Sequence, residues 1–317
     1  MPSREIAASS SAYYMGQVVF RVFRFLFMLL MTFVIMYPVL YMVSMAFRTV
    51  EDVYDPTVVW IPKHFSVQSF VLLYKELGIV KPLWNSLWIT LSSSVLQVFV
   101  VSLTAYGFAR FRFRTRGLLF VLLIFSIVVP PQMIAMPTYL SFAHFDLFGL
   151  LQSTTGSTIS LLGQPAIFPA LAILGQGIRA SLFILLMHQY YCGLPNELEE
   201  AALIDGCGYW RCFFSIILPS ALTQMFVIFL FSAVWYWNDY YFSSIYLGGS
   251  STFAVKLSNI RAMLENVAGL VNQSHNSYQI VIYEQAGCLV LILPMILLYV
   301  ITQRYFVEGL EKTGLVG

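Results

Sequence analysis

The residues from Val22 to Phe47 read VFRFLFMLLMTFVIMYPVLYMVSMAF, and this run decides the class of fold. A helix needs roughly 20 mostly apolar residues to cross the hydrocarbon core of a bilayer. Arg24 is the only charged residue in the run. The run exceeds the apolar core of a signal peptide and lacks a small-residue cleavage site, so we expect it to be a retained membrane anchor.

The composition of the whole chain agrees with this first run. Hydrophobic residues make up 59% of the 317 residues and charged residues 10%, whereas an ordinary soluble domain has about 25% charged residues. The formal net charge of +2 gives no indication of a nucleic-acid partner. These numbers predict an all-α, polytopic membrane protein in contact with lipid.

Five further runs have the length and apolar character of membrane spans, because backbone groups in lipid must be satisfied within a helix. They are Trp84–Ala109, Leu118–Leu140, Ala166–Tyr191, Leu218–Leu247 and Gln285–Tyr305. Glycine and proline interrupt the first half of the fourth run, and Pro130-Pro131 predicts a kink in the third. The expected organisation is an N-terminal segment 1–21, a six-span domain 22–306 and a tail 307–317.

Charges between the runs predict the orientation. The loop ARFRFRTR, from Ala109 to Arg116, carries four arginines between the second and third runs, which is typical of a cytoplasmic loop. With six spans, both termini and the segment 192–217 are then expected in the cytoplasm. External loops are expected near residues 48–83, 141–165 and 248–284, and the polar first loop is expected to be an ordered cap.

One polar segment stands out, EEAALIDGCGYWRCFFSIILP from Glu199 to Pro219. A proline followed by several acids predicts a helix start just before it, because acids are favourable at a helix N-terminus. Asp205-Gly206 predicts a turn, and Tyr209 to Ile216 a second short helix. Ala201 and Ala202 offer a small-residue surface, and the glutamates can pair with cations of another protein. We therefore expect this segment to be a docking site for that protein.

This segment resembles the EAA motif of permease subunits of binding-protein-dependent ABC importers. The matching positions are Glu200-Ala201-Ala202, Gly206, Ile216 and Leu218-Pro219. Further residues resemble the carbohydrate importers of the maltose-transporter type. They are Asn85-Ser86-Leu87, Ala105-Tyr106-Gly107-Phe108-Ala109-Arg110, Trp237-Asn238-Asp239 and the stretch Gln303 to Leu310. The resemblance covers nearly the whole chain from about Phe25.

The resemblance implies a type I ABC importer permease fold in the plasma (inner) membrane of a prokaryote. It implies three kinds of partner: a second homologous permease, two copies of an ATPase, and an extracellular or periplasmic solute-binding protein. It also implies that the EAA segment is a coupling helix seated on the ATPase. The coupling residues are then Glu199, Glu200, Ala201, Ala202, Asp205 and Gly206. The chain has no GxxxxGK[ST] motif, so we expect it to be non-catalytic, with ATP and Mg²⁺ on the partner ATPases.

Two candidates could contact a sugar on its path. The stretch WYWNDYY, from Trp235 to Tyr241, combines aromatic rings with polar groups. If it is helical, Trp237, Tyr240 and Tyr241 share one face, flanked by Asn238, while Trp235 and Asp239 share another. The alternative is that these aromatic residues mark the membrane interface. Arg179 is a cation within the fourth run, which indicates function by default, although it could instead snorkel to the outer end.

Neither a metal site nor a redox pair is expected. The four cysteines show no CxxC spacing and no histidine partners nearby, and the four histidines are scattered. Within the same class, a permease for a peptide or a polyol remains an alternative to one for oligosaccharides or other sugars. A self-sufficient secondary transporter would instead require inverted repeats and charged relays in the spans. The sequence names neither the sugar nor the companion permease.

Overall fold

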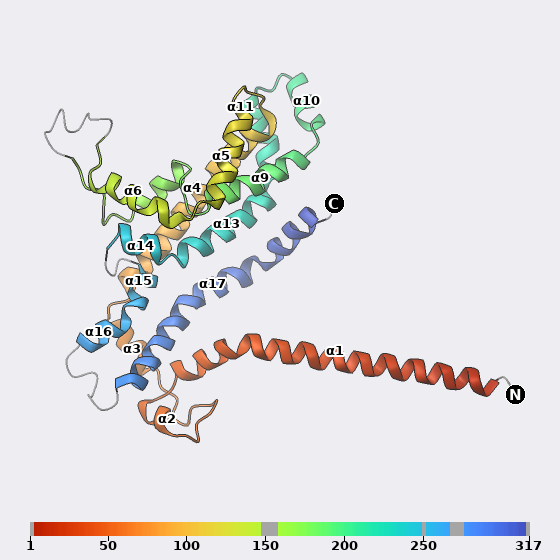
Figure 1. The fold of residues 1–317 in the computed structure, drawn as a ribbon, viewed down its shortest axis with the longest axis vertical. Helices are drawn as coiled ribbons and strands as arrows, with labels where there is room; N and C mark the ends of the chain where they lie inside the picture. The colour runs from red at the N-terminus through yellow and green to blue at the C-terminus, as the bar shows by residue number, and fades with distance from the viewer. Residues whose placement is uncertain (1–2, 76, 147–157, 249–251, 267–275, 315–317) are drawn as a thin grey trace. The chain divides into compact units, whose positions relative to one another are not determined.

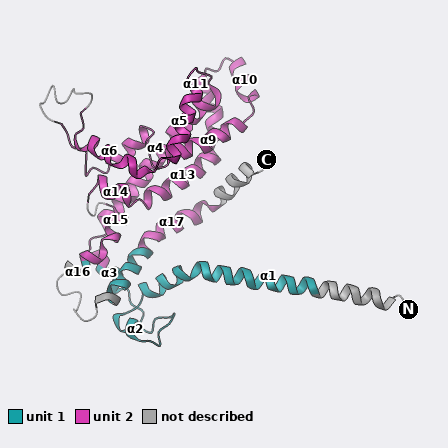
Figure 2. Cartoon of the chain, viewed as in Figure 1, with its two compact units in different colours: residues 1–72, 264–289 teal, residues 73–263, 290–317 magenta. Residues whose placement is uncertain are grey.

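The computed structural model describes residues 3–75, 77–146, 158–248, 252–266 and 276–314. Regular structure in these ranges is helical, and the extended pairing among them is one isolated antiparallel bridge between Phe145 and Ile159. The chain divides into two compact units (Figure 2). Unit 1 comprises residues 1–72 and 264–289, and unit 2 comprises residues 73–263 and 290–317.

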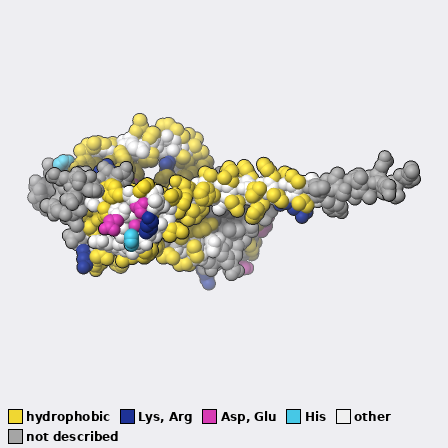
Figure 3. Space-filling view, turned by 90° about the horizontal axis from the view of Figure 1, so that it is seen from below, with side chains coloured by type: hydrophobic (Ala, Val, Ile, Leu, Met, Phe, Trp, Pro, Cys, Tyr) yellow, Lys and Arg dark blue, Asp and Glu magenta, His cyan; other side chains and the backbone are white. Residues whose placement is uncertain are grey.

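Unit 1 contains the long helix α1 (Ser3–Ala46) and the short helix α2 (Val50–Tyr54), with the first part of α3 (Gln68–Lys75) (Figure 1). The first predicted span lies within α1, because residues Gly16–Ala46 are long and apolar enough to cross a membrane. Most apolar side chains of this stretch are exposed. Figure 3 shows hydrophobic side chains covering the helix almost continuously, as expected of a surface that faces lipid or another apolar helix.

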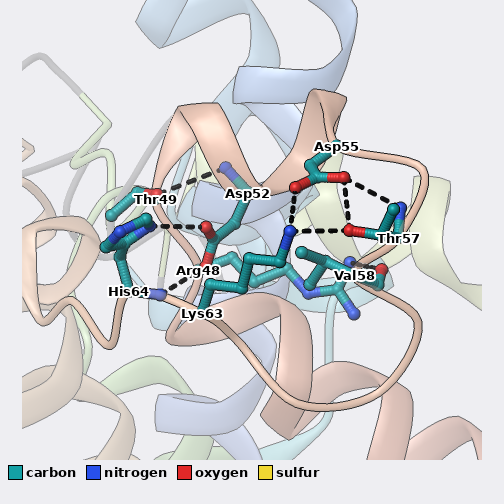
Figure 4. A network of polar contacts seen from close by, with 8 residues as sticks. All are labelled: Arg48, Thr49, Asp52, Asp55, Thr57, Val58, Lys63 and His64. Atoms are coloured by element: carbon teal, nitrogen blue, oxygen red, sulfur yellow. Dashed lines mark hydrogen bonds and ion pairs between the residues drawn. The ribbon is translucent and has the colours of Figure 1, made fainter.

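A polar network orders the loop that follows α1 (Figure 4). Arg48 is buried and donates to the carbonyl oxygens of Val58 (3.3 Å) and Val59 (2.7 Å) and to Ser44 Oγ (3.0 Å). Asp55 forms an ion pair with Lys63, and Thr57 donates to the same carboxylate. Hydrogen bonds thus tie the loop to the end of α1, which supports the expected ordered cap.

Asp52 is the second charged centre of this loop. Its carboxylate is 2% exposed and accepts hydrogen bonds from the backbone N–H of His64 (2.8 Å) and from His64 Nδ1 (2.9 Å). Burial acts to raise the pKa of Asp52, but the hydrogen bonds and charge of His64 outweigh it and hold this pKa below its ordinary value. The hydrogen bond from Lys63 likewise lowers the pKa of Asp55. Both acids therefore stabilise the loop in their ionised form.

Unit 2 is built around α4 (Val80–Arg110), which packs against α8 (Ile167–Ile173), α9 (Ala180–Gly193) and α13 (Leu222–Trp237) (Figure 1). Two hydrophobic clusters form its core. One surrounds the second half of α4, with Tyr106, Tyr191 and Phe213 among its buried rings. The other surrounds the first half and includes Phe168 and Tyr236.

The buried face of α4 is partly polar. Its buried residues include Ser86, Thr90, Ser93, Ser94, Gln97 and Ser102. Ser102 Oγ lies 2.6 Å from Tyr191 Oη, and Ser86 Oγ accepts from the backbone N–H of Phe253 (2.9 Å). Small side chains of this kind let helices approach closely in a membrane, where apolar burial gives little drive for association.

The predicted spans are only partly continuous helices. Three described helices could each cross a membrane, namely Gly16–Ala46, Val80–Arg110 and Gln279–Gln303, the last within α17 (Asn276–Gly314). The third predicted span is α5 (Arg116–Val128) and α6 (Pro131–Ala143), bent by 101°. The Pro130-Pro131 pair explains this bend, because proline cannot continue the hydrogen-bond ladder.

The fourth and fifth predicted spans are also broken. The fourth separates into α8 and α9, with residues 174–179 between them outside any helix. The fifth is bent by 74° near its start, where a short chain of elements meets α13. These elements are α11 (Tyr209–Cys212), a π-helix (Phe213–Ile217) and α12 (Leu218–Ser220). Shorter helices follow α13, namely α14 (Tyr241–Tyr246), α15 (Phe253–Ser258) and α16 (Ile260–Asn266).

Parts of two predicted external loops, residues 147–157, 249–251 and 267–275, lie outside the described residues.

Candidate functional site

A cavity of about 460 Å³ lies within unit 2, where the broken elements meet. Its lining comes from the junction of α5 and α6, from the break between α8 and α9, and from the end of α13 with the following α14. The lining is mostly apolar and aromatic, with the amides of Gln132 and Gln176 among its polar groups. Cavities of this size and character are the usual places for a small ligand.

The break between α8 and α9 has an unusual backbone. Gly175 has φ +74°, and Arg179 has φ 58° and ψ 23°, the only positive φ at a residue other than glycine in the described chain. A left-handed backbone is unfavourable for a residue with a Cβ atom, by roughly 1–2 kcal/mol. Such strain persists where surrounding contacts enforce it, and it is frequent at functional sites.

Two buried side chains provide these contacts. Gln97 Nε2 of α4 donates to the carbonyl oxygen of Ile178 (2.8 Å), and the backbone N–H of Ile178 donates to Tyr236 Oη of α13 (3.2 Å). Between them, Gly177 leaves no space, since an added Cβ would lie 2.5 Å from Gln97 Oε1 and 2.6 Å from Tyr236 Oη. The two side chains therefore hold the unwound segment from both sides. We call this group of three residues, Gln97, Gly177 and Tyr236, the clamp.

Arg179 follows the clamp and lines the cavity. Its guanidinium carbon lies 4.8 Å from the ring centroid of Trp235, a distance typical of cation–π stacking. Within the described ranges, the ion pairs join other residues, and none involves Arg179. The charge of Arg179 is thus supported by an aromatic face.

The stretch WYWNDYY does not form one helix, so its residues do not share the faces that helical spacing predicts. The helix α13 ends at Trp237, and α14 begins at Tyr241. The cause is Asp239, whose carboxyl group accepts from the backbone N–H groups of Phe242 (3.2 Å) and Ser243 (2.7 Å). Ser243 Oγ donates to it as well (2.8 Å). Asp239 thereby caps the start of a new helix.

The structure separates the predicted path residues into two groups. Arg179, Asp239 and Tyr241 line the cavity, while Trp237, Asn238 and Tyr240 do not. The buried Trp237 donates to the carbonyl oxygen of Leu291 (2.9 Å), and Asn238 Nδ2 donates to that of Val234 (2.9 Å). Trp237 thus packs within unit 2, whereas the exposed Asn238 bonds the last turn of its own helix.

Sequence reasoning missed Gln97 and Tyr236 as parts of this site. A glutamine within an apolar run was the available signal for Gln97, because an amide in a span needs a partner. Tyr236 gave no comparable signal, since six other aromatic or polar side chains of the same stretch compete with it.

The EAA segment folds as a short helix and a turn. The helix α10 (Glu197–Ile204) is followed by Asp205 at its C-cap, and Gly206 has φ +82°. The backbone N–H of Cys207 donates to the carbonyl oxygen of Ala202 (2.9 Å), which closes the helix end in the manner expected for a left-handed glycine. The predicted helix, turn and second helix are therefore present.

The coupling candidates of this segment face in different directions. Glu200, Ala201, Asp205 and Gly206 are exposed, together with Ile204 at 86%. Ala202 is buried in the core around the second half of α4. One side of α10 thus packs on its own chain, and the other side remains open to a partner.

Glu199 faces its own chain as well. Arg110, the last residue of α4, donates from Nε to Glu199 Oε1 (2.7 Å) and from Nη2 to the carbonyl oxygen of Leu194 (2.9 Å). It also bonds Asn196 Oδ1. The side chains of Arg110 and Glu199 are 12% and 15% exposed, so solvent screens this pair only partly. We call this arrangement the Arg110 joint; it attaches the beginning of α10 to the end of α4.

The expectation that no histidine lies near a cysteine is wrong at one position. Cys192 Sγ lies 3.6 Å from Nε2 of His188, because the two residues are four apart on α9. All four cysteines are free. Groups of three or more potential metal-binding side chains are absent from the part of the chain that the structure describes.

Long apolar helices, an unwound segment beside a cavity, and an exposed acidic helix define the class as an integral membrane transport subunit. Residues 100–311 match the family model described as "Binding-protein-dependent transport system inner membrane component". The chain therefore belongs to this family of ABC transporter permeases, whose members are non-catalytic membrane subunits, as the resemblance of the EAA segment predicted.

Two curated relatives illustrate the family. The maltodextrin transport system permease protein MdxG of Bacillus subtilis is 30% identical over 92% of this chain and 95% of its own length. A probable ABC transporter permease protein of the same organism, YurM, is 28% identical over 96% of this chain and 90% of its own length.

A solved structure is similar in fold. It is a chain of a bacterial ABC transporter involved in the import of the acidic polysaccharide alginate. The TM-score is 0.68 at 21% identity, covering 91% of this chain and 96% of that one. This likeness confirms the predicted fold of an ABC importer permease.

Proposed function

We propose that this chain forms one half of the membrane path of an ATP-driven importer of oligosaccharides or other sugars. A second permease forms the other half, two cytoplasmic ATPase subunits bind ATP and Mg²⁺, and an external binding protein delivers the sugar. Names of relatives such as MdxG support a carbohydrate substrate. The arginines of the loop after α4 support a cytoplasmic location for both termini and α10.

The observation that carries this proposal is the geometry of α10. Glu200 and Ile204 are exposed on a helix whose opposite side, at Ala202, is buried in the chain's own core. An exposed helix end with acids and a large apolar side chain fits a cleft with cations and an apolar floor. Movement of the ATPases would then displace α10 and, through the Arg110 joint, α4.

The cavity supports the second half of the proposal. It lies beside the clamp, to which α4 contributes Gln97, and rings such as Trp235 and Tyr241 line it together with amides. Aromatic faces suit the apolar faces of sugar rings, and amides suit hydroxyl groups. A shift of α4 would change the clamp and hence the cavity, which links ATP-driven movement to sugar binding. A partner can drive such a shift only by binding the two states with different affinity.

The test is co-purification from detergent-solubilised native membranes with a tagged chain. Wild type is expected to recover a second permease and an ATPase. Gly206→Trp and Glu200→Arg are each expected to lose most of the ATPase and to retain the second permease, because they change only the docking side of α10.

Gly163→Trp is the matched control for Gly206→Trp. Both glycines have φ +82° with open space around them, so the backbone strain of the two substitutions is alike. Gly163 lies in a loop expected on the opposite side of the membrane, and its variant should recover the ATPase normally. Recovery of the chain alone from wild-type membranes would contradict the proposal, as would full ATPase recovery with both α10 variants.

A further inference from the structure

The two charged residues that line the cavity differ in how many of their hydrogen-bonding groups lack a partner in the described chain. Among the described lining residues, Arg179 is the only lysine or arginine and Asp239 the only acid. If each were free to meet a ligand, the cavity would be neutral on balance. Their hydrogen bonds decide which of them can do so.

Asp239 is occupied. Both of its oxygens accept hydrogen bonds from the start of α14, two from backbone N–H groups and one from Ser243 Oγ. A ligand that took these oxygens would leave donors of α14 unsatisfied, which is unfavourable. The carboxyl group therefore belongs to the fold of α13 and α14, and it offers little to a cation or a hydroxyl group in the cavity.

Arg179 is free at its edge. The guanidinium carbon lies over the ring of Trp235, 4.8 Å from its centroid, and the group has five N–H donors in its plane. No hydrogen bond or ion pair of these donors is present in the described part of the chain. An arginine with a supported face and a vacant edge is the arrangement that binds a carboxylate or a phosphate through two parallel hydrogen bonds.

The position of Arg179 is enforced by its surroundings. The clamp holds the peptide group of Ile178 on both sides, and Arg179 next to it has the strained φ of 58°. Ala180 and Ser181, at the start of α9, also line the cavity, and the N-terminus of a helix adds positive potential. The strained backbone and the contact with Trp235 favour a binding role over snorkelling.

From these contacts we propose that the cavity selects an anionic sugar, with its carboxylate or phosphate bound to the edge of Arg179. This inference rests on the proposed function as a sugar permease and narrows its substrate class. An unpaired cation within the membrane is unfavourable, so an acidic ligand gains more from Arg179 than a neutral sugar of the same shape. The ring of the ligand would lie against the neighbouring aromatic side chains.

The experiment measures binding to the full importer, purified from native membranes and placed in lipid nanodiscs without its binding protein. Saturation-transfer NMR is recorded with three probes, namely glucuronate, glucose 6-phosphate and glucose. We expect both anions to bind at least tenfold more tightly than glucose. Arg179→Asn should weaken both anions by roughly tenfold or more and leave glucose unchanged, because a charge-assisted pair is lost.

Two variants serve as controls. Arg179→Lys keeps the charge without the planar fork, so it should retain part of the preference for anions. Arg112→Asn removes an exposed arginine outside the cavity and should change nothing. Asparagine tolerates a left-handed backbone, so Arg179→Asn is not expected to unfold the segment.

Each remaining outcome would overturn the inference. Equal binding of glucose and the anions, with Arg179→Asn matching wild type, would leave the sugar path standing and remove its charge preference. Anion binding that survives Arg179→Asn would place the anion elsewhere. If none of the three probes binds, both the inference and the assignment of this cavity to the sugar path are wrong, whereas ATPase co-purification would still stand.

Discussion

Unit 2 contains two arginines with opposite surroundings, Arg110 at the end of α4 and Arg179 at the start of α9. Arg110 bonds a carboxylate, a carbonyl oxygen and an amide oxygen of its own chain. Arg179 rests on Trp235 over a cavity and has a strained backbone. The side chain of Arg110 stabilises the fold. Arg179 lines the cavity, and its left-handed backbone is unfavourable for folding.

An arginine in an apolar chain can either complete the fold or bind a ligand. Arg110 follows the second predicted span and Arg179 lies within the fourth, and charge alone does not distinguish them. The distinguishing features are the hydrogen-bond partners and the backbone. A satisfied arginine on an unstrained helix end is structural, whereas an unsatisfied one in a left-handed conformation suggests binding.

The largest expected effect comes from breaking the Arg110 joint. Arg110→Glu places two acids together in a partly buried site, and removing one partner of such a pair destabilises by roughly 3–5 kcal/mol. We expect a clear drop in the thermal unfolding temperature of the purified protein and loss of ATP-driven sugar uptake. The charge-swapped double variant, Arg110→Glu with Glu199→Arg, should recover part of both.

Two control variants test whether Arg110 and Arg179 differ in their contribution to stability. Arg112→Glu changes an exposed arginine two residues away and should have little effect. Arg179→Asn should leave the unfolding temperature unchanged or raise it slightly, because asparagine accepts the left-handed backbone at lower cost. If Arg110→Glu and Arg179→Asn were equally destabilising, the distinction between a structural and a binding arginine would fail.

A smaller effect is expected at the clamp. Gly177→Ala would force a Cβ into Gln97 and Tyr236, and overpacking of this kind costs about 1–3 kcal/mol. Part of the strain can be relieved by movement of the Gln97 amide, so we expect the lower half of that range. Thermal unfolding measures the loss.

Gly107→Ala is the matched control, because an added Cβ there meets nothing within 4 Å and lies in the helix α4. Alanine favours a helix over glycine, so this variant should be as stable as wild type or slightly more so. Equal stability of the two alanine variants would show that the unwound segment is not held from both sides.

The smallest expected effect is a pH dependence in unit 1. The pKa of Asp52 is lower in the folded loop than its ordinary value of 3.8. Its ionised form therefore stabilises the loop above about pH 4, and this contribution is lost as the pH falls through the folded pKa. His64 is largely exposed, so the contribution is about 1 kcal/mol or less.

Hydrogen exchange of residues 48–67 at a series of pH values measures this contribution, after correction for the intrinsic exchange rates. Protection should fall on the acid side in wild type and fall less in Asp52→Asn, which cannot titrate. A variant that loses protection over the same pH range as wild type would show that another group controls the loop.

Much of the architecture could be predicted from the sequence because lipid imposes a simple rule on backbone groups. The first, second and sixth runs are continuous helices, and the Pro130-Pro131 kink is present. The EAA segment was also predictable, since its helix start, its Asp205-Gly206 turn and its second helix each have a local chemical cause.

The site was less predictable because it depends on contacts between distant residues. The break before α9 requires Gln97, which lies 81 positions from its partner Ile178. The end of α13 depends on Asp239, whose capping competes with helix continuation and is not evident from apolar periodicity. The inward orientation of Glu199 depends on its ion pair with Arg110, which lies 89 positions away in the sequence.

The continuity of α4 has a mechanical consequence. Arg110 and Gln97 lie on the same unbroken helix, separated by about 20 Å at a rise of 1.5 Å for each residue. A rod of that length that tilts by about 5° about one end moves its other end by roughly 1.7 Å. The hydrogen bond from Gln97 to the carbonyl oxygen of Ile178 (2.8 Å) would not survive a displacement of this size, since N–H···O bonds have donor–acceptor distances of about 2.7–3.2 Å. A small tilt of α4 can therefore make or break the hydrogen bond between Gln97 and Ile178.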